Sequence, residues 1–228
     1  VLAFNTAERL RTPVFIMADA AIGHMREPVV IPPETEIPRV HRTLPETGGD
    51  PFAIQGFLSE DVAPMPIFGN GFKSHVTGSC HDGYGMRNVV DATALDHFVR
   101  TLTNKITKHR DSLMHMESES TDDAEVLLLG YGLVGRAALA ISRQARSEGL
   151  PVGCVRPITV WPFADAEIRA LCGKARRVLV MENNLGQMLP YVQAALAGIT
   201  TAEPLPPRIL GSLHHPDHVL EAIREVLS

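Results

Sequence analysis

The last third of the chain alternates short apolar runs with longer segments whose apolar residues recur at helical spacing. Runs this short, bounded by Gly or Pro, are typical of strands buried on both faces of a parallel sheet. The predicted strands lie at residues 125–129, 152–155, 178–181 and 208–210, and the predicted helices at about 134–148, 165–172, 187–196 and from Pro216 onward.

Regular alternation of strands and helices with short connections predicts an α/β fold with a mostly parallel sheet and right-handed crossovers. In such folds, binding and chemistry occur in the loops at the carboxyl ends of the strands. We therefore expect functional residues in the loops that include Gly130, Arg156 and Glu182.

The beginning of the chain is predicted to be a helix over residues 1–10, followed by an apolar strand over 13–18. Because one helix and one strand cannot enclose a core, residues 1–35 are interpreted as the C-terminal end of a domain that starts before Val1. Residues 36–120, rich in Gly and Pro, are predicted to be an irregular connector with a helix near 93–113. A polar run then marks the start of a second domain, residues 121–228.

Charge and composition argue against two classes of function, nucleic-acid binding and membrane spanning. The formal net charge of the 228 residues is −5 and is not clustered, which argues against a nucleic-acid surface. No apolar stretch approaches the roughly 18 residues of a membrane span. Cys80, Cys154 and Cys172 show no C-x-x-C spacing, and this usage fits a reducing, cytoplasmic setting.

Gly130, Gly132 and Gly135 form a G-x-G-x-x-G sequence directly after a predicted strand. In a Rossmann-like domain, bare glycine backbone lets the pyrophosphate of NAD(P) approach a helix N-terminus. The next strand should then end in an acidic residue for the ribose, but Arg156 stands there and would instead suit a 2′-phosphate. The glycine-rich sequence is therefore compatible both with a tight structural turn and with NAD(P) binding.

Two further loops carry candidate residues. Trp161, the only Trp, lies between two prolines, and could either dock a partner or cover the core. Glu182 and Asn184 follow a strand and precede a helix. They could bind a substrate or partner group, or Asn184 could cap that helix.

Histidines give weaker signals. His214, His215 and His218 coincide with a helix start, where Pro216 and Asp217 have ordinary structural reasons to occur, so a zinc site is not expected. Other candidate polar sites are His24 with Arg26 and Glu27, and His81 with Asp82. No nucleophile, base and acid form a recognisable catalytic set.

Several segments together resemble the alpha subunit of the 2-oxoacid:ferredoxin oxidoreductases, most closely the 2-oxoglutarate type. The matching residues are 3–14, 23–27, 75–78 with 81–82, 156–163 and 182–187, and they follow the family's order over nearly the whole chain. The resemblance implies the end of a thiamine pyrimidine-binding domain followed by a domain like the C-terminal part of transketolase. The Gly130 sequence would then be a structural turn.

The resemblance also implies an activity, namely oxidative decarboxylation of a 2-oxoacid, with 2-oxoglutarate expected and the branched-chain type as the nearest alternative. The acyl group would pass to coenzyme A and the electrons to ferredoxin. Thiamine diphosphate, magnesium and a [4Fe-4S] cluster would be held mainly by a beta subunit. The family's catalytic Glu would lie before Val1.

This chain alone is therefore expected to be inactive, to hold no cofactor by itself, and to act as a structural and docking part of a hetero-oligomer. The candidate polar or interface residues are His24, Arg26, Glu27, His81, Asp82, Arg156, Trp161, Glu182 and Asn184. A nicotinamide-binding domain and a pure interaction module remain the rival interpretations.

Overall fold

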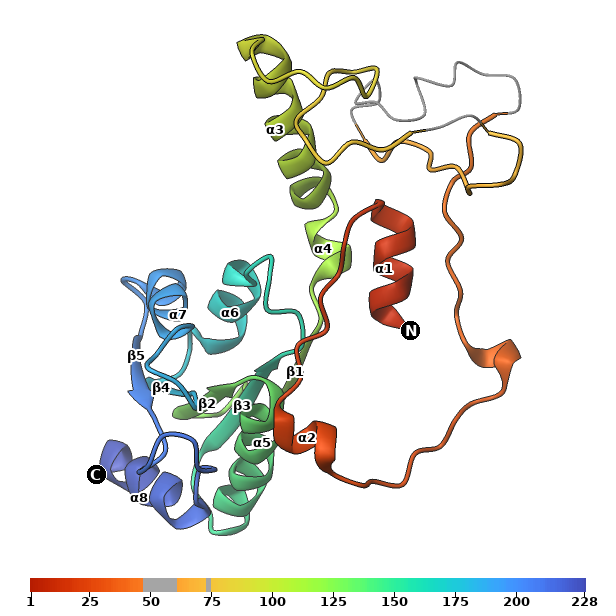
Figure 1. The fold of residues 1–228 in the computed structure, drawn as a ribbon. Coiled ribbons are helices and arrows are strands. Elements are labelled where there is room, and N and C mark those ends of the chain that lie inside the picture. Colours follow the sequence, from red (N-terminus) through yellow and green to blue (C-terminus); the bar gives the residue numbers. More distant parts are fainter. Residues whose placement is uncertain (47–60, 73–74) are drawn as a thin grey trace. The chain divides into compact units, whose positions relative to one another are not determined.

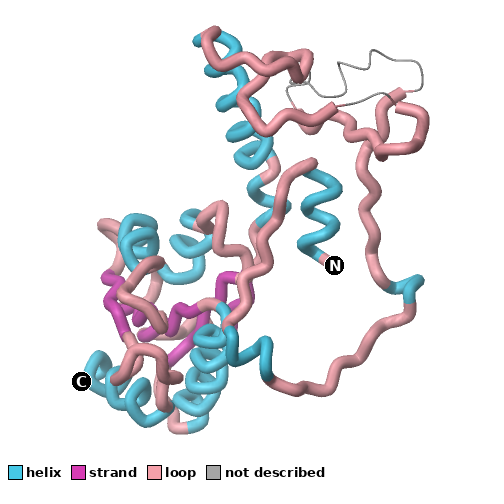
Figure 2. The backbone as a smooth tube through the Cα atoms, viewed as in Figure 1, coloured by secondary structure: helices cyan, strands magenta, loops and turns pink. Residues whose placement is uncertain are grey.

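A computed structural model describes residues 1–46, 61–72 and 75–228. The chain divides into two compact units, Val1–Ile16 with Arg26–Leu113 and Met17–Met25 with Met114–Ser228. Figure 2 distinguishes the helices, the strands and the long loops. Among the described residues, no helix combines the length and the apolar character that a bilayer span requires.

A five-stranded sheet with the order β1-β3-β2-β4-β5 forms the centre of the second unit (Figure 1). Its strands are β1 (Met116–Glu119), β2 (Val126–Gly130), β3 (Val152–Pro157), β4 (Arg177–Met181) and β5 (Thr201–Leu205). Strands β2 to β5 are parallel, and β1 pairs antiparallel with β3. The predicted α/β class with a mostly parallel sheet is confirmed.

Two pairs of helices cover the two faces of this sheet (Figure 1). Helices α5 (Gly132–Ser147) and α8 (Pro216–Leu227) pack on one face, and α6 (Asp165–Cys172) and α7 (Leu189–Leu196) on the other. Alternate side chains of a strand point to opposite faces. Leu127 and Leu129 accordingly contribute to one core cluster, and Val126 and Leu128 to the other. Double-sided burial explains why β2 is apolar throughout.

The predicted helices of this unit are confirmed, but its two edge strands were not predicted. The expected strand at 208–210 is wrong, because those residues form a loop and the edge strand is β5. Its sequence includes Pro204, which an edge strand tolerates because one of its sides needs no ladder hydrogen bonds. Strand β1 lies in the polar run that was interpreted as a domain boundary.

The described part of the first unit contains helices α1 (Leu2–Leu10), α3 (Ala92–Lys108) and α4 (Arg110–Leu113), and the short 3-10 helix Glu34–Glu36. The Asn5 side chain donates to the Pro38 carbonyl at 2.8 Å and accepts from the Val40 amide at 3.0 Å. Lys105 donates to the carbonyl of Arg11 at 2.9 Å, which joins α3 to the end of α1.

The strand expected at 13–18 is wrong, because these residues pair with no strand among the described residues. An apolar run becomes a strand only when a neighbouring strand supplies its hydrogen bonds. The short helix α2 (Ala20–His24) follows in the second unit and was not predicted. The domain limits 1–35, 36–120 and 121–228 stay predictions.

We expect Gly135→Ala to destabilise the chain by about 1–3 kcal/mol, the usual cost of overpacking. A Cβ atom on Gly135 would lie 2.6 Å from the Gly130 carbonyl oxygen and 2.8 Å from Cγ of Arg156. Urea unfolding measures the loss. Gly23→Ala is the control, since its Cβ would meet no atom within 4 Å among the described residues. Equal midpoints for the two variants would contradict this packing.

Candidate functional site

Tyr131, Glu182 and Asn184 form a hydrogen-bonded cluster at the carboxyl ends of β2 and β4. Tyr131 directly follows β2 and Glu182 directly follows β4. Because these strands are parallel neighbours with Gly130 opposite Met181, their next residues emerge side by side. The position is the one at which parallel α/β folds commonly place function.

Glu182 is 3% exposed, and both of its carboxylate oxygens are hydrogen-bonded. Oε1 accepts from the Leu189 amide at 2.9 Å, and Oε2 accepts from the Met188 amide at 2.9 Å and from the Tyr131 hydroxyl at 3.1 Å. These amides are at the start of α7, where the helix dipole favours a negative charge. The buried carboxylate therefore acts as the cap of α7.

Asn184 makes hydrogen bonds both within its own loop and to Tyr131. Its Oδ1 accepts from the amides of Gly186 and Gln187 at 2.8 and 3.0 Å, and its Nδ2 donates to the Tyr131 hydroxyl at 2.9 Å. Asn184 thus stabilises the turn before α7. The side chain that caps α7 is Glu182 and not Asn184, which was the expected alternative. Burial, and then the Glu182 charge, raise the pKa of Tyr131 and keep it protonated at neutral pH.

The glycine-rich turn between β2 and α5 is occupied by a carboxylate of the chain itself. Oδ2 of Asp19 accepts from the Leu133 amide at 2.8 Å. The same oxygen lies 2.7 Å from where a Cβ of Gly132 would be, and Gly132 has a φ of +56°. A nucleotide phosphate would need this position. The geometry therefore favours the structural-turn interpretation over NAD(P) binding.

Arg156 and Trp161 belong to the segment that begins at the end of β3. Nη1 of Arg156 pairs with Oε2 of Glu117 at 2.7 Å, across the β1–β3 pair. Trp161 is 72% exposed, and Ile158 and Val160 beside it are also exposed. A ring this exposed does not cover the core, and the docking role of Trp161 stays a prediction.

The remaining predicted residues lie apart from this cluster. His81 donates from Nδ1 to the Asp82 carbonyl at 2.9 Å, and Oδ1 of Asp82 accepts two amides of the turn that follows. Both belong to the first unit, as do the exposed Arg26 and Glu27, whereas the exposed His24 belongs to the second. Of the nine candidates, Glu182 and Asn184 share a partner, Tyr131.

The described residues do not bring potential metal ligands together at one place. No group of three or more His, Cys, Asp or Glu side chains there is arranged to hold a metal ion. Cys154 and Cys172 lie in core clusters on opposite faces of the sheet, and burial raises the pKa of each thiol to about 12. The described part of the chain therefore offers no ready-made group of three or more such ligands for a metal ion or an iron–sulfur cluster.

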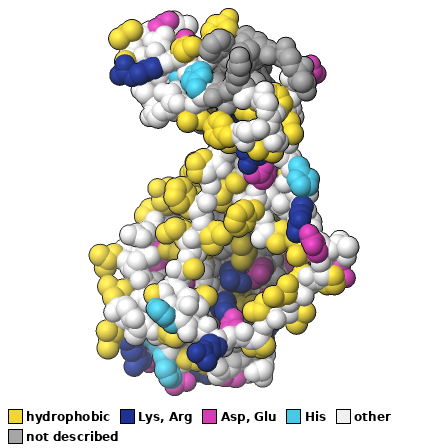
Figure 3. Space-filling view, turned by 45° about the vertical axis from the view of Figure 1, so that its right-hand side comes forward, with side chains coloured by type: hydrophobic (Ala, Val, Ile, Leu, Met, Phe, Trp, Pro, Cys, Tyr) yellow, Lys and Arg dark blue, Asp and Glu magenta, His cyan; other side chains and the backbone are white. Residues whose placement is uncertain are grey.

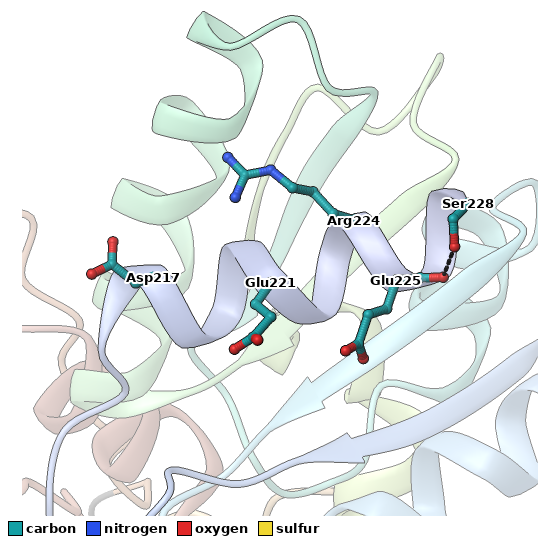
Figure 4. Close-up of a pocket in the computed structure, with 5 residues that line it drawn as sticks. All are labelled: Asp217, Glu221, Arg224, Glu225 and Ser228. Atoms are coloured by element: carbon teal, nitrogen blue, oxygen red, sulfur yellow. Dashed lines mark hydrogen bonds between the residues drawn. The ribbon is translucent and has the colours of Figure 1, made fainter.

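His214 is buried within the second unit, where it hydrogen-bonds the Leu205 carbonyl at 2.7 Å and burial lowers its pKa. A shallow pocket on the neighbouring helix α8 is lined by charged residues (Figure 4). In it, Arg224 pairs with Glu148 at 2.5 Å and Glu221 with Arg208 at 2.9 Å. Two of the charged side chains that line the pocket are therefore engaged in ion pairs within the chain.

The sequence alone did not identify Tyr131 and Asp19 as residues of the candidate site. Tyr131 could have been found, since it directly follows a predicted strand in the glycine-rich sequence. Asp19 could not, because its partner Leu133 lies 114 residues further along the chain.

Two family profiles together cover most of the chain. "Pyruvate flavodoxin/ferredoxin oxidoreductase, thiamine diP-bdg" matches residues 1–100, and "Pyruvate:ferredoxin oxidoreductase core domain II" matches residues 124–219. A 2-oxoglutarate synthase subunit KorA from Methanothermobacter marburgensis is 39% identical over 98% of this chain and 59% of its own length. The chain belongs to the alpha-subunit family of the 2-oxoacid:ferredoxin oxidoreductases.

A more distant relative is the ketoisovalerate oxidoreductase subunit VorB from Methanothermobacter thermautotrophicus, 31% identical over 98% of this alpha-subunit chain and 55% of its own length. The chain therefore spans somewhat more than half the length of these curated relatives.

A solved 2-oxoglutarate:ferredoxin oxidoreductase from Magnetococcus marinus, with 2-oxoglutarate, coenzyme A and succinyl-CoA bound, has the same fold. The TM-score is 0.80 at 20% identity, over 98% of this chain and 39% of that one.

We expect a single thiol of the folded chain to react with Ellman's reagent at pH 8. With a pKa of about 12, only about one in ten thousand Cys154 or Cys172 thiols is ionised at that pH, whereas Cys80 is partly exposed. All three should react in guanidinium chloride, which provides the control. Rapid reaction of a second thiol in the folded chain would disprove the burial described here.

Proposed function

We propose that this chain is part of the alpha subunit of an enzyme that oxidises 2-oxoglutarate. In the proposed reaction 2-oxoglutarate loses carbon dioxide, its acyl carbon is joined to the sulfur of coenzyme A, and two electrons pass to two ferredoxins. The supporting observation is the greater identity to a 2-oxoglutarate synthase subunit, 39%, than to a ketoisovalerate oxidoreductase subunit, 31%, over the same share of the chain.

Thiamine diphosphate would supply the carbanion chemistry of the decarboxylation when bound to the whole enzyme. The match of residues 1–100 to a thiamine diphosphate-binding family supports this cofactor. The described residues offer no group of three or more metal ligands for magnesium or a [4Fe-4S] cluster. We therefore place both on a beta subunit.

The contribution of this chain would be structural. In the second unit, the polar groups at the ends of β2 and β4 bond to one another and to the start of α7, and Asp19 bonds to the start of α5. Large apolar residues nearby remain exposed, notably Trp161 at 72% and Leu185 at 88%. Figure 3 shows hydrophobic side chains exposed on the surface that it displays. Exposed apolar surface of this kind suits docking of another subunit.

The rival interpretations have less support. A nicotinamide cofactor would have to displace Asp19 from the glycine-rich turn. A pure interaction module would not account for matches to oxidoreductase families over residues 1–100 and 124–219. A branched-chain substrate stays the nearest alternative within the family.

Activity of the complete enzyme tests the proposed substrate. The full-length alpha subunit is purified with its beta subunit, and ferredoxin reduction is followed with 2-oxoglutarate or 2-oxoisovalerate in the presence of coenzyme A. We expect kcat/KM to be at least about tenfold higher for 2-oxoglutarate. One well-placed polar contact to the substrate is enough to give discrimination of this size. A preference for 2-oxoisovalerate would replace the proposed substrate with the branched-chain one.

We expect Trp161→Ala to weaken association of the alpha and beta subunits by about ten- to a hundredfold, the usual loss for an aromatic anchor. The dissociation constant can be measured by analytical ultracentrifugation. Ile209→Ala is the matched control, because Ile209 is also 72% exposed but lies in the loop after β5. If the two variants weaken association equally or not at all, Trp161 is not part of the docking surface.

Titration with NAD or NADP, followed by Trp161 fluorescence, addresses the nicotinamide alternative. We expect no saturable binding in the micromolar range, because the Asp19 carboxylate would repel and block the pyrophosphate. A positive control is an established NADP-dependent dehydrogenase under the same conditions. Saturable micromolar binding would instead support the nucleotide-binding interpretation.

A further inference from the structure

Asn70 lies in an exposed turn of the first unit, and it is the only Asn of the chain that precedes a Gly. The Asn70 amide donates to the Ile67 carbonyl at 3.2 Å, which closes a four-residue turn. Gly69 and Gly71 have φ values of +90° and +82°, a conformation that glycine adopts without strain. Residues 67–71 are all exposed, so the Asn70 side chain is in contact with solvent.

The surroundings of this turn are open. A Cβ atom placed on Gly69 or Gly71 would meet no atom within 4 Å among the described residues. Within the part of the chain that the structure describes, neither the Asn70 side chain nor the Gly71 amide makes a hydrogen bond. No described contact therefore holds the Asn70 carboxamide away from the Gly71 nitrogen that follows it.

The other Asn residues of the chain are held in place. Four of their side chains accept hydrogen bonds from backbone amides, namely those of Asn5, Asn88, Asn183 and Asn184. Asn104 lies inside α3, where helical hydrogen bonds fix the backbone. Such bonds oppose the approach of a side-chain carboxamide to the next backbone nitrogen. Both the sequence and the local structure therefore distinguish Asn70 from the other Asn residues.

We propose that Asn70 is a site of spontaneous covalent modification, at which water converts the side-chain amide to a carboxylate. The Gly71 nitrogen attacks Cγ of Asn70, and the Cγ–Nδ2 bond breaks. Nδ2 leaves as ammonia together with the proton of the Gly71 amide, and a five-membered imide remains. Water then adds to either carbonyl carbon of the imide, which opens to aspartate or isoaspartate. Glycine favours the attack because it has no side chain to obstruct it.

The modification changes the surface of the first unit. It adds one negative charge beside the exposed side chains of Ile67 and Phe68, and isoaspartate also adds one carbon atom to the main chain of the turn. Because the turn is exposed and its glycines have open space around them, the modified chain should stay folded. This inference goes beyond the proposed function and does not depend on it.

Heavy-oxygen water detects the modification in the complete alpha–beta enzyme. After incubation at pH 8 and trypsin digestion in ordinary water, mass spectrometry measures the heavy oxygen in each peptide. We expect incorporation at Asn70 to be at least about tenfold faster than at Asn88, because the β-branched Val89 obstructs attack there. Asn70→Gln should abolish it, whereas Asn104→Gln, the matched control, should leave it unchanged. Equal incorporation at Asn70 and Asn88, or none at Asn70, would overturn the proposal.

Two further measurements test the imide and the open turn. A carboxyl methyltransferase specific for isoaspartate should label the same peptide from S-adenosylmethionine, and heavy oxygen without methyl labelling would overturn the imide route.

Unfolding in guanidinium chloride provides the comparison for the turn. We expect the rate at Asn70 to change by less than about threefold on unfolding, whereas Asn184, held by hydrogen bonds, should react at least about tenfold faster when unfolded. Protection of Asn70 by the fold to the same extent as Asn184 would overturn the proposal. Because every readout is a mass or a methyl label, failure of the enzyme to oxidise 2-oxoglutarate would leave this test intact.

Discussion

Burial of β2 on both faces of the sheet is the constraint on which the second unit depends. Each of its leucines is fully buried, Leu127 and Leu129 toward one pair of helices and Leu128 toward the other. Burying a side chain of this size contributes about 1.5–3 kcal/mol. Because a strand surrounded in this way cannot carry polar side chains, polar groups first occur where it ends.

At those ends the chain satisfies its own helix termini. Glu182 accepts hydrogen bonds from the start of α7, and Asp19 accepts one from the start of α5. A helix N-terminus near the carboxyl edge of a parallel sheet is where many α/β proteins bind a phosphate. Here two carboxylates of the chain occupy those places. The backbone at this edge resembles an anion-binding site, but its amides bind side chains of the same chain and so stabilise the fold.

This arrangement agrees with the structural contribution that we propose for the chain. The polar groups at the sheet edge are used internally, the two core thiols are protonated, and Trp161 and Leu185 are exposed. Such an exposed apolar surface is compatible with the docking of another subunit that we propose. The two relatives described above are named as subunits of a 2-oxoglutarate synthase and of a ketoisovalerate oxidoreductase.

The sequence by itself determined the central strands β2, β3 and β4 and the helices between and after them, because double-sided burial and helical periodicity are local patterns. It also narrowed the glycine-rich sequence to two interpretations. Only the tertiary structure decided between them, by bringing Asp19 to Leu133. The edge strands β1 and β5 likewise became recognisable only beside their partners, because an edge strand may be polar or contain proline. Contacts between residues far apart in the chain leave no periodic trace in the sequence.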